Sequence, residues 1–326
     1  MKKNVDGRIR SRRRRARRRR SYQRKILFSM AIAVLLVFFG EKAWSASENM
    51  RQGIWPEPET VQDTERGRGA LRNLNSPNAV LIDAETGDIL EGYNSGKRIY
   101  PASLTKIMTA VLAVEYTEDM EEIIALPSGF FQKLYGENAS MAGFEPGEQV
   151  RLMDLLYGIL LPSGAECCLA FAERISGSEE EFAGLMNEKA AELGMKDTRF
   201  CNSTGLHETG HYSTAEDIAV LLRYAVKNDR FREAFTSESY HTMPSEAHPD
   251  GFTFTSSMFR HLNGTEISNG AVLGGKTGYT PEAGLCLASL AEVSGKEYIL
   301  VTAGAGGNHE TEPYHVMDAV NVYNRL

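Results

Sequence analysis

Hydrophobic and polar residues alternate in short runs at two distant places in the chain. Residues 79–83 and 89–93 are strand-like runs, and residues 85–88 between them have the composition of a hairpin turn. Three longer runs follow much later, over 270–280, 284–293 and 298–303. The pattern therefore predicts strands in two parts of the sequence that lie far apart.

Between these strand regions, apolar residues recur at every third or fourth position, which is the spacing of a helix with one buried face. Helices are expected from Ser103 onward, over 152–161, 166–175 and 179–193, from Ser213 onward and over 314–323. At Ser213 a capping box also marks the helix start, because Glu216 follows three residues later. The middle of the chain is therefore predicted to be mostly helical.

Strands at both ends of a domain with helices between them are typical of an α+β fold. We expect residues 76–326 to form one antiparallel β-sheet flanked by helices, together with a mostly helical subdomain. Residues 41–75 are polar and show no apolar period, so they are expected to form a flexible stem.

The first 40 residues differ sharply from the rest in charge and hydrophobicity. Residues 1–25 hold 14 Lys or Arg and one acid, a net charge of +13, and residues 26–40 are mostly apolar. The whole chain has 36 basic and 43 acidic residues, so the remainder carries −20. Basic residues beside an apolar segment stay in the cytoplasm, so 1–25 are predicted to be a cytoplasmic tail and the rest to lie outside the membrane. No basic stretch accompanies this tail elsewhere, which argues against a nucleic-acid partner.

The apolar segment has two interpretations. Its uninterrupted run of about 14 residues is nearer the core of a signal peptide than the roughly 20 residues of a membrane-spanning helix. Ala43 and Ser45 are small enough for cleavage after Ser45, whereas the large Trp44 between them fits such a site poorly. Both outcomes stay open: a single anchor at the extracytoplasmic face of the cell membrane, or a secreted protein.

Cysteine usage fits an exported protein without a disulfide framework. The chain has four cysteines, Cys167, Cys168, Cys201 and Cys286. A bridge from one of the first two to Cys201 stays open, and buried free thiols are the interpretation we favour. No Cys-x-x-Cys spacing indicates a metal site.

Ser103 and Lys106 are the first candidates for chemistry. Residues three apart on a helix face the same way, which brings a hydroxyl and an amine together. A serine hydroxyl becomes a strong nucleophile only when a base takes its proton, and a desolvated lysine can be that base. The Ser-x-x-Lys pattern alone is weak, since a chain of this length contains about one by chance.

A second motif, Lys276-Thr277-Gly278, is more specific. It is expected by chance in fewer than about a tenth of such chains, and it falls on the predicted strand 270–280. Glycine in a strand lets another backbone approach closely, so this strand is a candidate for pairing with an extended substrate.

The order Ser103-x-x-Lys106, Ser163 and Lys276-Thr277-Gly278 resembles that of the penicillin-binding and serine β-lactamase superfamily. Five longer stretches are similar to one branch, the low-molecular-weight D-alanyl-D-alanine carboxypeptidases: 101–106, 161–164, 193–195, 202–206 and 211–215. The resemblance covers about residues 70–326. It implies a β-lactamase/transpeptidase-like fold and a serine peptidase that trims the terminal D-Ala from peptidoglycan stem peptides.

For the chemistry, the resemblance implies that Ser103 forms an acyl-enzyme, with Lys106 as its base. Ser163 would pass protons toward the leaving group. No cofactor is implied, and β-lactam antibiotics would act as covalent inhibitors.

For substrate binding, the resemblance implies that Lys276 and Thr277 hold the terminal carboxylate of the stem peptide. The backbone N–H groups of Ser103 and Tyr279 would form the oxyanion hole, with Gly278 between the binding residues and Tyr279.

Residues 165 and 166 depart from the family pattern. The second family motif is usually Ser-x-Asn, whereas Ser163-Gly164 is followed here by Ala165. Losing a hydrogen bond of that kind costs about 1 to 3 kcal/mol when its partner stays buried. Glu166 would replace the missing amide only if its helix turned toward the cleft, and the alternative is an ordinary solvated acid at a helix start.

His207-Glu208-Thr209-Gly210-His211 matches the His-Glu-x-x-His pattern of zinc peptidases. That chemistry needs one continuous helix, whereas this segment contains Gly210 and ends at a helix cap, so we expect a loop. The other histidines, 241, 248, 261, 309 and 315, show no spacing that argues for more than surface positions.

Four hypotheses follow. The first is a D-alanyl-D-alanine carboxypeptidase. Ala165 motivates the second, a penicillin-binding scaffold or sensor protein that has lost turnover. A β-lactamase is third, because no Glu-x-x-Leu-Asn segment is present, and a zinc peptidase is last.

Overall fold

The computed structural model describes residues 69–262 and 264–326. The predicted cytoplasmic tail, the apolar segment 26–40 and residues 41–68 of the stem lie outside the described residues. Within the described ranges, no helix is both long enough and apolar enough to cross a membrane.

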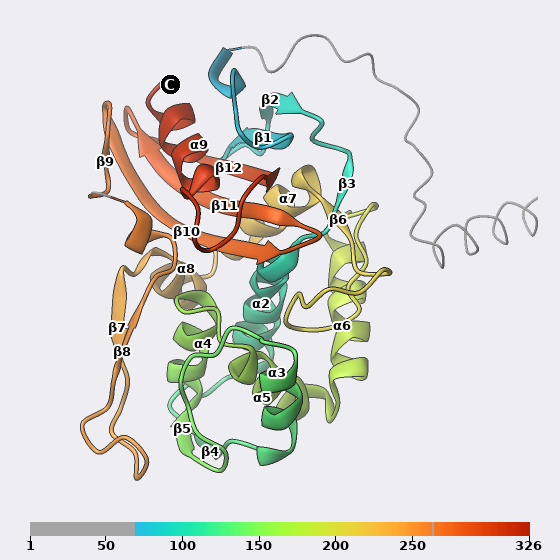
Figure 1. The fold of residues 1–326 in the computed structure, drawn as a ribbon, viewed down its shortest axis with the longest axis vertical. Coiled ribbons are helices and arrows are strands. Elements are labelled where there is room, and N and C mark those ends of the chain that lie inside the picture. The colour runs from blue at the N-terminus through green and yellow to red at the C-terminus, as the bar shows by residue number, and fades with distance from the viewer. Residues whose placement is uncertain (1–68, 263) are drawn as a thin grey trace, which may run out of the picture. The chain divides into compact units, whose positions relative to one another are not determined.

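A six-stranded antiparallel sheet, with strand order β2-β1-β12-β11-β10-β9, is the framework of the fold (Figure 1). Its strands are β1 (Asn78–Asp83), β2 (Ile89–Tyr93), β9 (Glu266–Ile267), β10 (Gly270–Thr280), β11 (Gly284–Val293) and β12 (Lys296–Ala305). β1 pairs with β12, so that Asn78 lies opposite Ala303. The prediction of one antiparallel sheet built from both ends of the domain is confirmed.

Both faces of this sheet are buried, and the side chains of β12 show how. Ile299 and Val301 are fully buried in the larger apolar core, between the sheet and the helical subdomain. Leu300, between them, points to the opposite face and packs in a second core. Alternate residues of a strand point to opposite faces, so an almost continuous apolar run is what a sheet covered on both sides requires.

Helices cover the two faces unequally (Figure 1). The helices are α2 (Lys106–Tyr116), α3 (Phe131–Gly136), α4 (Leu152–Leu160), α5 (Ala165–Ser176), α6 (Glu179–Glu192), α7 (Ala215–Ala225), α8 (Asp229–Thr236) and α9 (Tyr314–Tyr323). On one face α9 lies alone against β11 and β12; on the other, α7 and α8 contact the sheet, and α2 packs between them and the remaining helices. The chain therefore joins a sheet to a mostly helical subdomain, as the pattern predicts.

Short elements complete the fold. Single-turn 3-10 helices are η1 (Gly69–Leu71), η2 (Ala102–Thr105), η3 (Ser128–Phe130) and η4 (Phe259–His261). Three small strand pairs join β3 (Arg98–Ile99) to β6 (Ser213–Thr214), β4 (Ile123–Ala125) to β5 (Gln149–Arg151), and β7 (Ser239–His241) to β8 (Thr253–Thr255). The β7–β8 hairpin extends away from the sheet (Figure 1).

Two boundary predictions need correction. The helix expected at Ser213 begins two residues later, because the Thr214 hydroxyl accepts from Asp217 N and Thr214 is the cap. Residues 69–75, assigned to the flexible stem, belong to the fold. Ala70 and Leu71 are buried in the second core, and Asn75 N donates to Asp318 Oδ1 at 2.9 Å.

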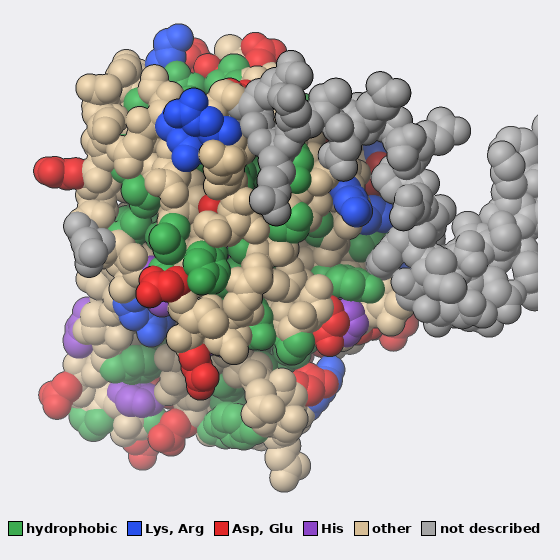
Figure 2. All heavy atoms as spheres, turned by 45° about the horizontal axis from the view of Figure 1, so that its top comes forward, with side chains coloured by type: hydrophobic (Ala, Val, Ile, Leu, Met, Phe, Trp, Pro, Cys, Tyr) green, Lys and Arg blue, Asp and Glu red, His purple; other side chains and the backbone are tan. Residues whose placement is uncertain are grey.

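Charged side chains are dispersed on one face of the protein. On the face shown in Figure 2, Lys and Arg lie singly or in small groups among Asp and Glu. The interior has few charged groups, and two of them, Lys106 and Lys276, lie where the helical subdomain meets the sheet.

Candidate active site

Ser103 lies on η2, the 3-10 turn that leads directly into α2. The sequence pattern predicts that Ser103 lies on the first turn of an α-helix. This prediction is wrong, because the turn is a 3-10 helix. In a 3-10 turn, residues three apart are eclipsed, so Ser103 and Lys106 still stack on one side. Lys106 Nζ donates to Ser103 Oγ at 2.9 Å, and the predicted nucleophile–base pair is in contact.

Two glycines allow the chain to close around this turn. A Cβ on Gly278 would lie only 3.1 Å from Ser103 N and 3.2 Å from Pro101 O, so β10 and η2 touch through their backbones. On the other side, a Cβ on Gly205 would lie 1.9 Å from Ala102 O. Ala102 itself has φ +47, a left-handed conformation that fixes the approach to Ser103.

Lys106 is buried, with 3% of its surface exposed, and it makes two hydrogen bonds. The second goes to Thr204 O at 2.7 Å. Burial lowers its pKa below the ordinary value of a lysine, while Cys168 and Glu166 act in the opposite direction. A lysine with a lowered pKa is more often neutral, which is the state that accepts a proton from Ser103.

Ser163 lies in the turn between α4 and α5 and faces the same cleft as Ser103. Its φ is +72, an uncommon conformation for a residue with a side chain, and its buried hydroxyl has no hydrogen-bond partner among the described residues. Strained residues and unpaired buried polar atoms both concentrate at functional sites. The hydroxyl is free to bond to a substrate.

The strand that carries Lys276-Thr277-Gly278 forms the opposite wall. Thr277 lines the cleft, and its hydroxyl bonds to Ser257 Oγ at 2.6 Å. Lys276 is fully buried behind this wall, where Nζ donates to Thr277 O at 2.8 Å. Burial and the nearby Lys106 lower its pKa. Carboxylate binding by Lys276 stays a prediction, because its side chain does not line the cleft.

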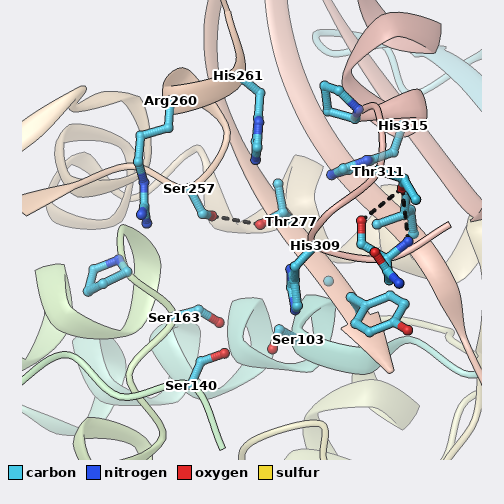
Figure 3. Close-up of a pocket in the computed structure, with 16 residues that line it drawn as sticks. Ser103, Ser140, Ser163, Ser257, Arg260, His261, Thr277, His309, Thr311 and His315 are labelled. Carbon is cyan, nitrogen blue, oxygen red and sulfur yellow. Dashed lines mark hydrogen bonds between the residues drawn. The ribbon is translucent and has the colours of Figure 1, made fainter. Parts of the chain in front are cut away.

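The cleft between these walls has a volume of about 420 Å³. Figure 3 shows Ser103, Ser140 and Ser163 along one wall, with Thr277, Ser257, Arg260 and His261 across from them. Tyr279 and Gly278 also line it. The oxyanion-hole role of the Ser103 and Tyr279 N–H groups stays a prediction. Among the residues that the structure describes, none that lines this cleft is Asp or Glu.

The sequence pattern missed several residues of the cleft. Arg260 is the one Lys or Arg among the described residues that line the cleft, and η4 brings it there. Of the histidines expected at the surface, His261, His309 and His315 line the cleft, and His315 is 5% exposed. No periodicity marks them, because short loops and helix starts position them.

Neither interpretation of Glu166 is correct. Its side chain is fully buried and does not line the cleft, so it neither replaces an amide there nor meets solvent. Oε1 accepts from Ala142 N at 2.7 Å and from Gly143 N at 2.9 Å. Ala165 packs beside Leu134 and Leu169 in a small apolar cluster.

The segment 207–211 is a loop, as expected, and its two histidines do not act together. His207 packs edge-on against Tyr100. His211 is buried, its Nε2 lies 2.8 Å from Thr105 Oγ1, and burial lowers its pKa to about 3. Within the described ranges, no group of His, Cys, Asp or Glu has the arrangement of a metal site. All four cysteines are free thiols; Cys167, Cys168 and Cys286 are buried, as we favoured, whereas Cys201 is half-buried.

Residues 64–307 match the model of one protein family, described as D-alanyl-D-alanine carboxypeptidase. The chain belongs to this family. The resemblance inferred from the motifs is therefore confirmed.

Curated relatives agree with this assignment. The chain is 34% identical over 284 residues to the D-alanyl-D-alanine carboxypeptidase DacF of Bacillus subtilis, which covers 86% of this chain and 66% of the relative. It is 32% identical over 237 residues to DacC of Escherichia coli, covering 69% of this chain and 56% of the relative. The chain thus spans less than two thirds of the length of these relatives.

Solved structures share the fold. The Streptomyces K15 DD-transpeptidase superposes with a TM-score of 0.70 at 25% identity, covering 78% of this chain and 97% of that one. A D-alanyl-D-alanine carboxypeptidase from Mycobacterium tuberculosis superposes with a TM-score of 0.66 at 23% identity, covering 83% and 94%. The transpeptidase-like fold expected from the motifs agrees with both.

Proposed function

We propose that the protein is a serine-type D-alanyl-D-alanine carboxypeptidase that acts on peptidoglycan stem peptides. The observation that carries the proposal is the 2.9 Å contact between Lys106 Nζ and Ser103 Oγ, inside a cleft walled by the strand of Thr277. Family membership and the names of the relatives support the substrate class.

In the proposed acylation step, neutral Lys106 takes the proton of Ser103 Oγ as that oxygen bonds to the penultimate carbonyl carbon. The carbonyl oxygen becomes an anion next to the N–H groups of Ser103 and Tyr279. The bond to the terminal D-Ala nitrogen then breaks, and the proton reaches that nitrogen through the Ser163 hydroxyl. Each proton transfer joins groups that line one cleft or touch it.

Hydrolysis of the acyl-enzyme completes the reaction. Lys106, again neutral, removes a proton from water, whose oxygen bonds to the acyl carbon while Ser103 Oγ leaves and regains a proton. The terminal carboxylate of the substrate is held by Thr277 and Ser257, with the charge of Arg260 nearby. β-Lactam antibiotics enter the same cleft as covalent inhibitors of Ser103.

The test is D-Ala release from a peptide that ends in D-Ala-D-Ala, measured with and without penicillin. The proposal predicts release that penicillin abolishes and that Ser103→Ala lacks. A protein that forms a covalent penicillin adduct without releasing D-Ala would instead support the scaffold or sensor hypothesis that Ala165 motivates. If the protein forms no penicillin adduct and releases no D-Ala, both hypotheses are refuted.

We also propose that residues 26–40 hold the protein at the extracytoplasmic face of the cell membrane. The support is the basic tail 1–25 beside an apolar segment. Determining the N-terminus of the mature protein decides the question. A retained tail supports the anchor, whereas a mature chain that begins just after Ser45 contradicts it and indicates secretion.

A further inference from the structure

Glu166 is a buried carboxylate that the proposed mechanism does not use. It is the second residue of α5, and none of its surface is exposed. Oε1 accepts two successive backbone N–H groups, from Ala142 and Gly143, and Oε2 has no hydrogen-bond partner among the described residues. Burying a carboxylate is costly unless it is hydrogen-bonded or paired with a charge, so its partners are informative.

Those partners belong to a loop that forms part of the cleft. Ser140, two residues before Ala142, lines the cleft, and its carbonyl oxygen accepts from Ala165 N at 2.8 Å. The first turn of α5 therefore holds the loop at three backbone groups. Figure 3 shows the hydroxyls of Ser140 and Ser163 close together on the wall that also carries Ser103.

The same loop packs onto the turn that carries Ser163. A Cβ on Gly164 would lie 2.6 Å from Ala142 Cβ and 2.9 Å from Ala142 N, so loop and turn are in direct contact. Gly164 N donates to Gly158 O at 2.7 Å on the other side of the turn. A residue in the left-handed region, such as Ser163 with φ +72, keeps that conformation only where its surroundings fix it from several sides.

The charge of Glu166 also reaches Lys106. Burial lowers the pKa of Lys106, and Cys168, Glu166, Cys167 and Glu179 oppose that effect. Lys276, from β10, faces the same region and is itself influenced by Lys106. Of the opposing groups, Glu166 is the one whose hydrogen bonds also fix the cleft loop.

We propose that Glu166 is a positioning residue: its carboxylate fixes the loop at Ala142 and Gly143, which holds Ser140 and Ser163 opposite the nucleophile Ser103. This role rests on the proposed function, because it concerns the same acylation step. Ala165 stands where the family usually has Asn, so this chain has no amide side chain at that position. Glu166, the next residue, fixes the cleft loop instead.

Two substitutions in the full chain separate the effect of the Glu166 hydrogen bonds from the effect of its negative charge. Glu166→Ala leaves the N–H groups of Ala142 and Gly143 without this acceptor, and we expect the rate of acylation by a fluorescent penicillin to fall about tenfold to a hundredfold. Glu166→Gln keeps an oxygen acceptor, so the expected fall is under about tenfold. Both variants lack the negative charge that raises the Lys106 pKa. The acid limb of the rate–pH profile should therefore move to lower pH in both.

Asp318 supplies the matched control, because it is also a fully buried carboxylate that accepts two successive backbone N–H groups, from Asn75 and Ser76. It lies on α9, on the other face of the sheet. Asp318→Ala should lower the melting temperature and leave the acylation rate and its pH profile unchanged.

Amide hydrogen exchange at Ala142 and Gly143 gives a readout that does not depend on activity. Faster exchange in Glu166→Ala than in the parent supports the proposal even if the parent shows no acylation, which would refute the proposed function alone. Parent-like exchange, acylation rate and pH profile in Glu166→Ala would overturn the proposal. If that variant does not fold, a Glu166→Gln protein with an unshifted pH profile and an unchanged rate overturns it.

Discussion

The two walls of the cleft differ in the burial and charge of their side chains. The wall from the helical subdomain carries Ser103 and Ser163, backed by the buried Lys106, and its groups are held in strained or desolvated positions. The wall from the sheet side carries Thr277 and, on η4, the exposed Arg260. Proton transfer needs a shifted pKa, which burial supplies, whereas capture of an anionic substrate needs a charge that stays in contact with water. The difference assigns bond making to the helical wall and substrate binding to the sheet wall.

The largest effect should come from Lys106→Ala, on the helical wall. Without the base, the Ser103 hydroxyl keeps its proton, and we expect acylation by penicillin to fall by at least about three orders of magnitude. In the parent protein, the acylation rate should rise with pH through the lowered pKa of Lys106, because the neutral amine is the active form. Rapid-quench measurements across pH check both statements. A variant that acylates within tenfold of the parent would remove Lys106 from the mechanism.

Ser163→Ala should have the next largest effect, a fall in D-Ala release of about a hundredfold. Its hydroxyl has no hydrogen-bond partner among the described residues, so its removal breaks no hydrogen bond with them and the melting temperature should stay within about one degree. Turnover and thermal unfolding, measured together, separate the two effects. A large loss of stability with normal turnover would make Ser163 a structural residue.

A smaller effect on binding is expected from Arg260→Gln, on the sheet wall. Losing one charge-assisted contact to a carboxylate should raise KM about tenfold and leave kcat within about twofold. A substrate with a C-terminal amide should show no such difference between parent and variant. If kcat falls and KM does not, the division of labour between the walls is wrong.

The smallest expected effect is on the free energy of unfolding at acid pH. It distinguishes a buried histidine from an exposed one. Burial lowers the pKa of His211 to about 3 from 6.5, so between these values the unfolded state binds more protons and the free energy of unfolding falls as pH falls. His211→Gln keeps a partner for Thr105 and removes this titration, so stability should depend less steeply on pH in that window. Urea unfolding between pH 4 and 7 measures the slope, with exposed His241→Gln as the control. Equal slopes in all three proteins would contradict the assignment.

The fold was predictable where burial imposes a period. β10, β11 and α9 have the predicted bounds, because each has a buried face whose apolar spacing fits one type of element. β2 also has the predicted bounds, although its Ile89 and Leu90 are exposed. The hairpin β7–β8 and helix α8 were missed, since they are short and polar on their outer sides. The helix start expected at Ser213 was placed two residues too early, because the cap is Thr214 and serine and threonine cap helices in the same way.

The site was predictable only in part. The sequence motifs identify Ser103, Lys106, Ser163 and Thr277, and the fold brings these residues together. Three of them line the cleft, and Lys106 contacts Ser103. Arg260 and His261 lie on η4, His309 in a loop and His315 in the first turn of α9, and neither period nor spacing indicates which way such side chains point. Glu166 was misjudged because its partners are backbone N–H groups, which the sequence does not distinguish.

The central claim is that Ser103 is the nucleophile of this cleft. Its most direct test is to react the protein with penicillin, digest it and locate the adduct by tandem mass spectrometry. We expect one penicilloyl group, on the peptide that contains Ser103 and on that residue. An adduct on Ser163 or Ser140 would contradict it.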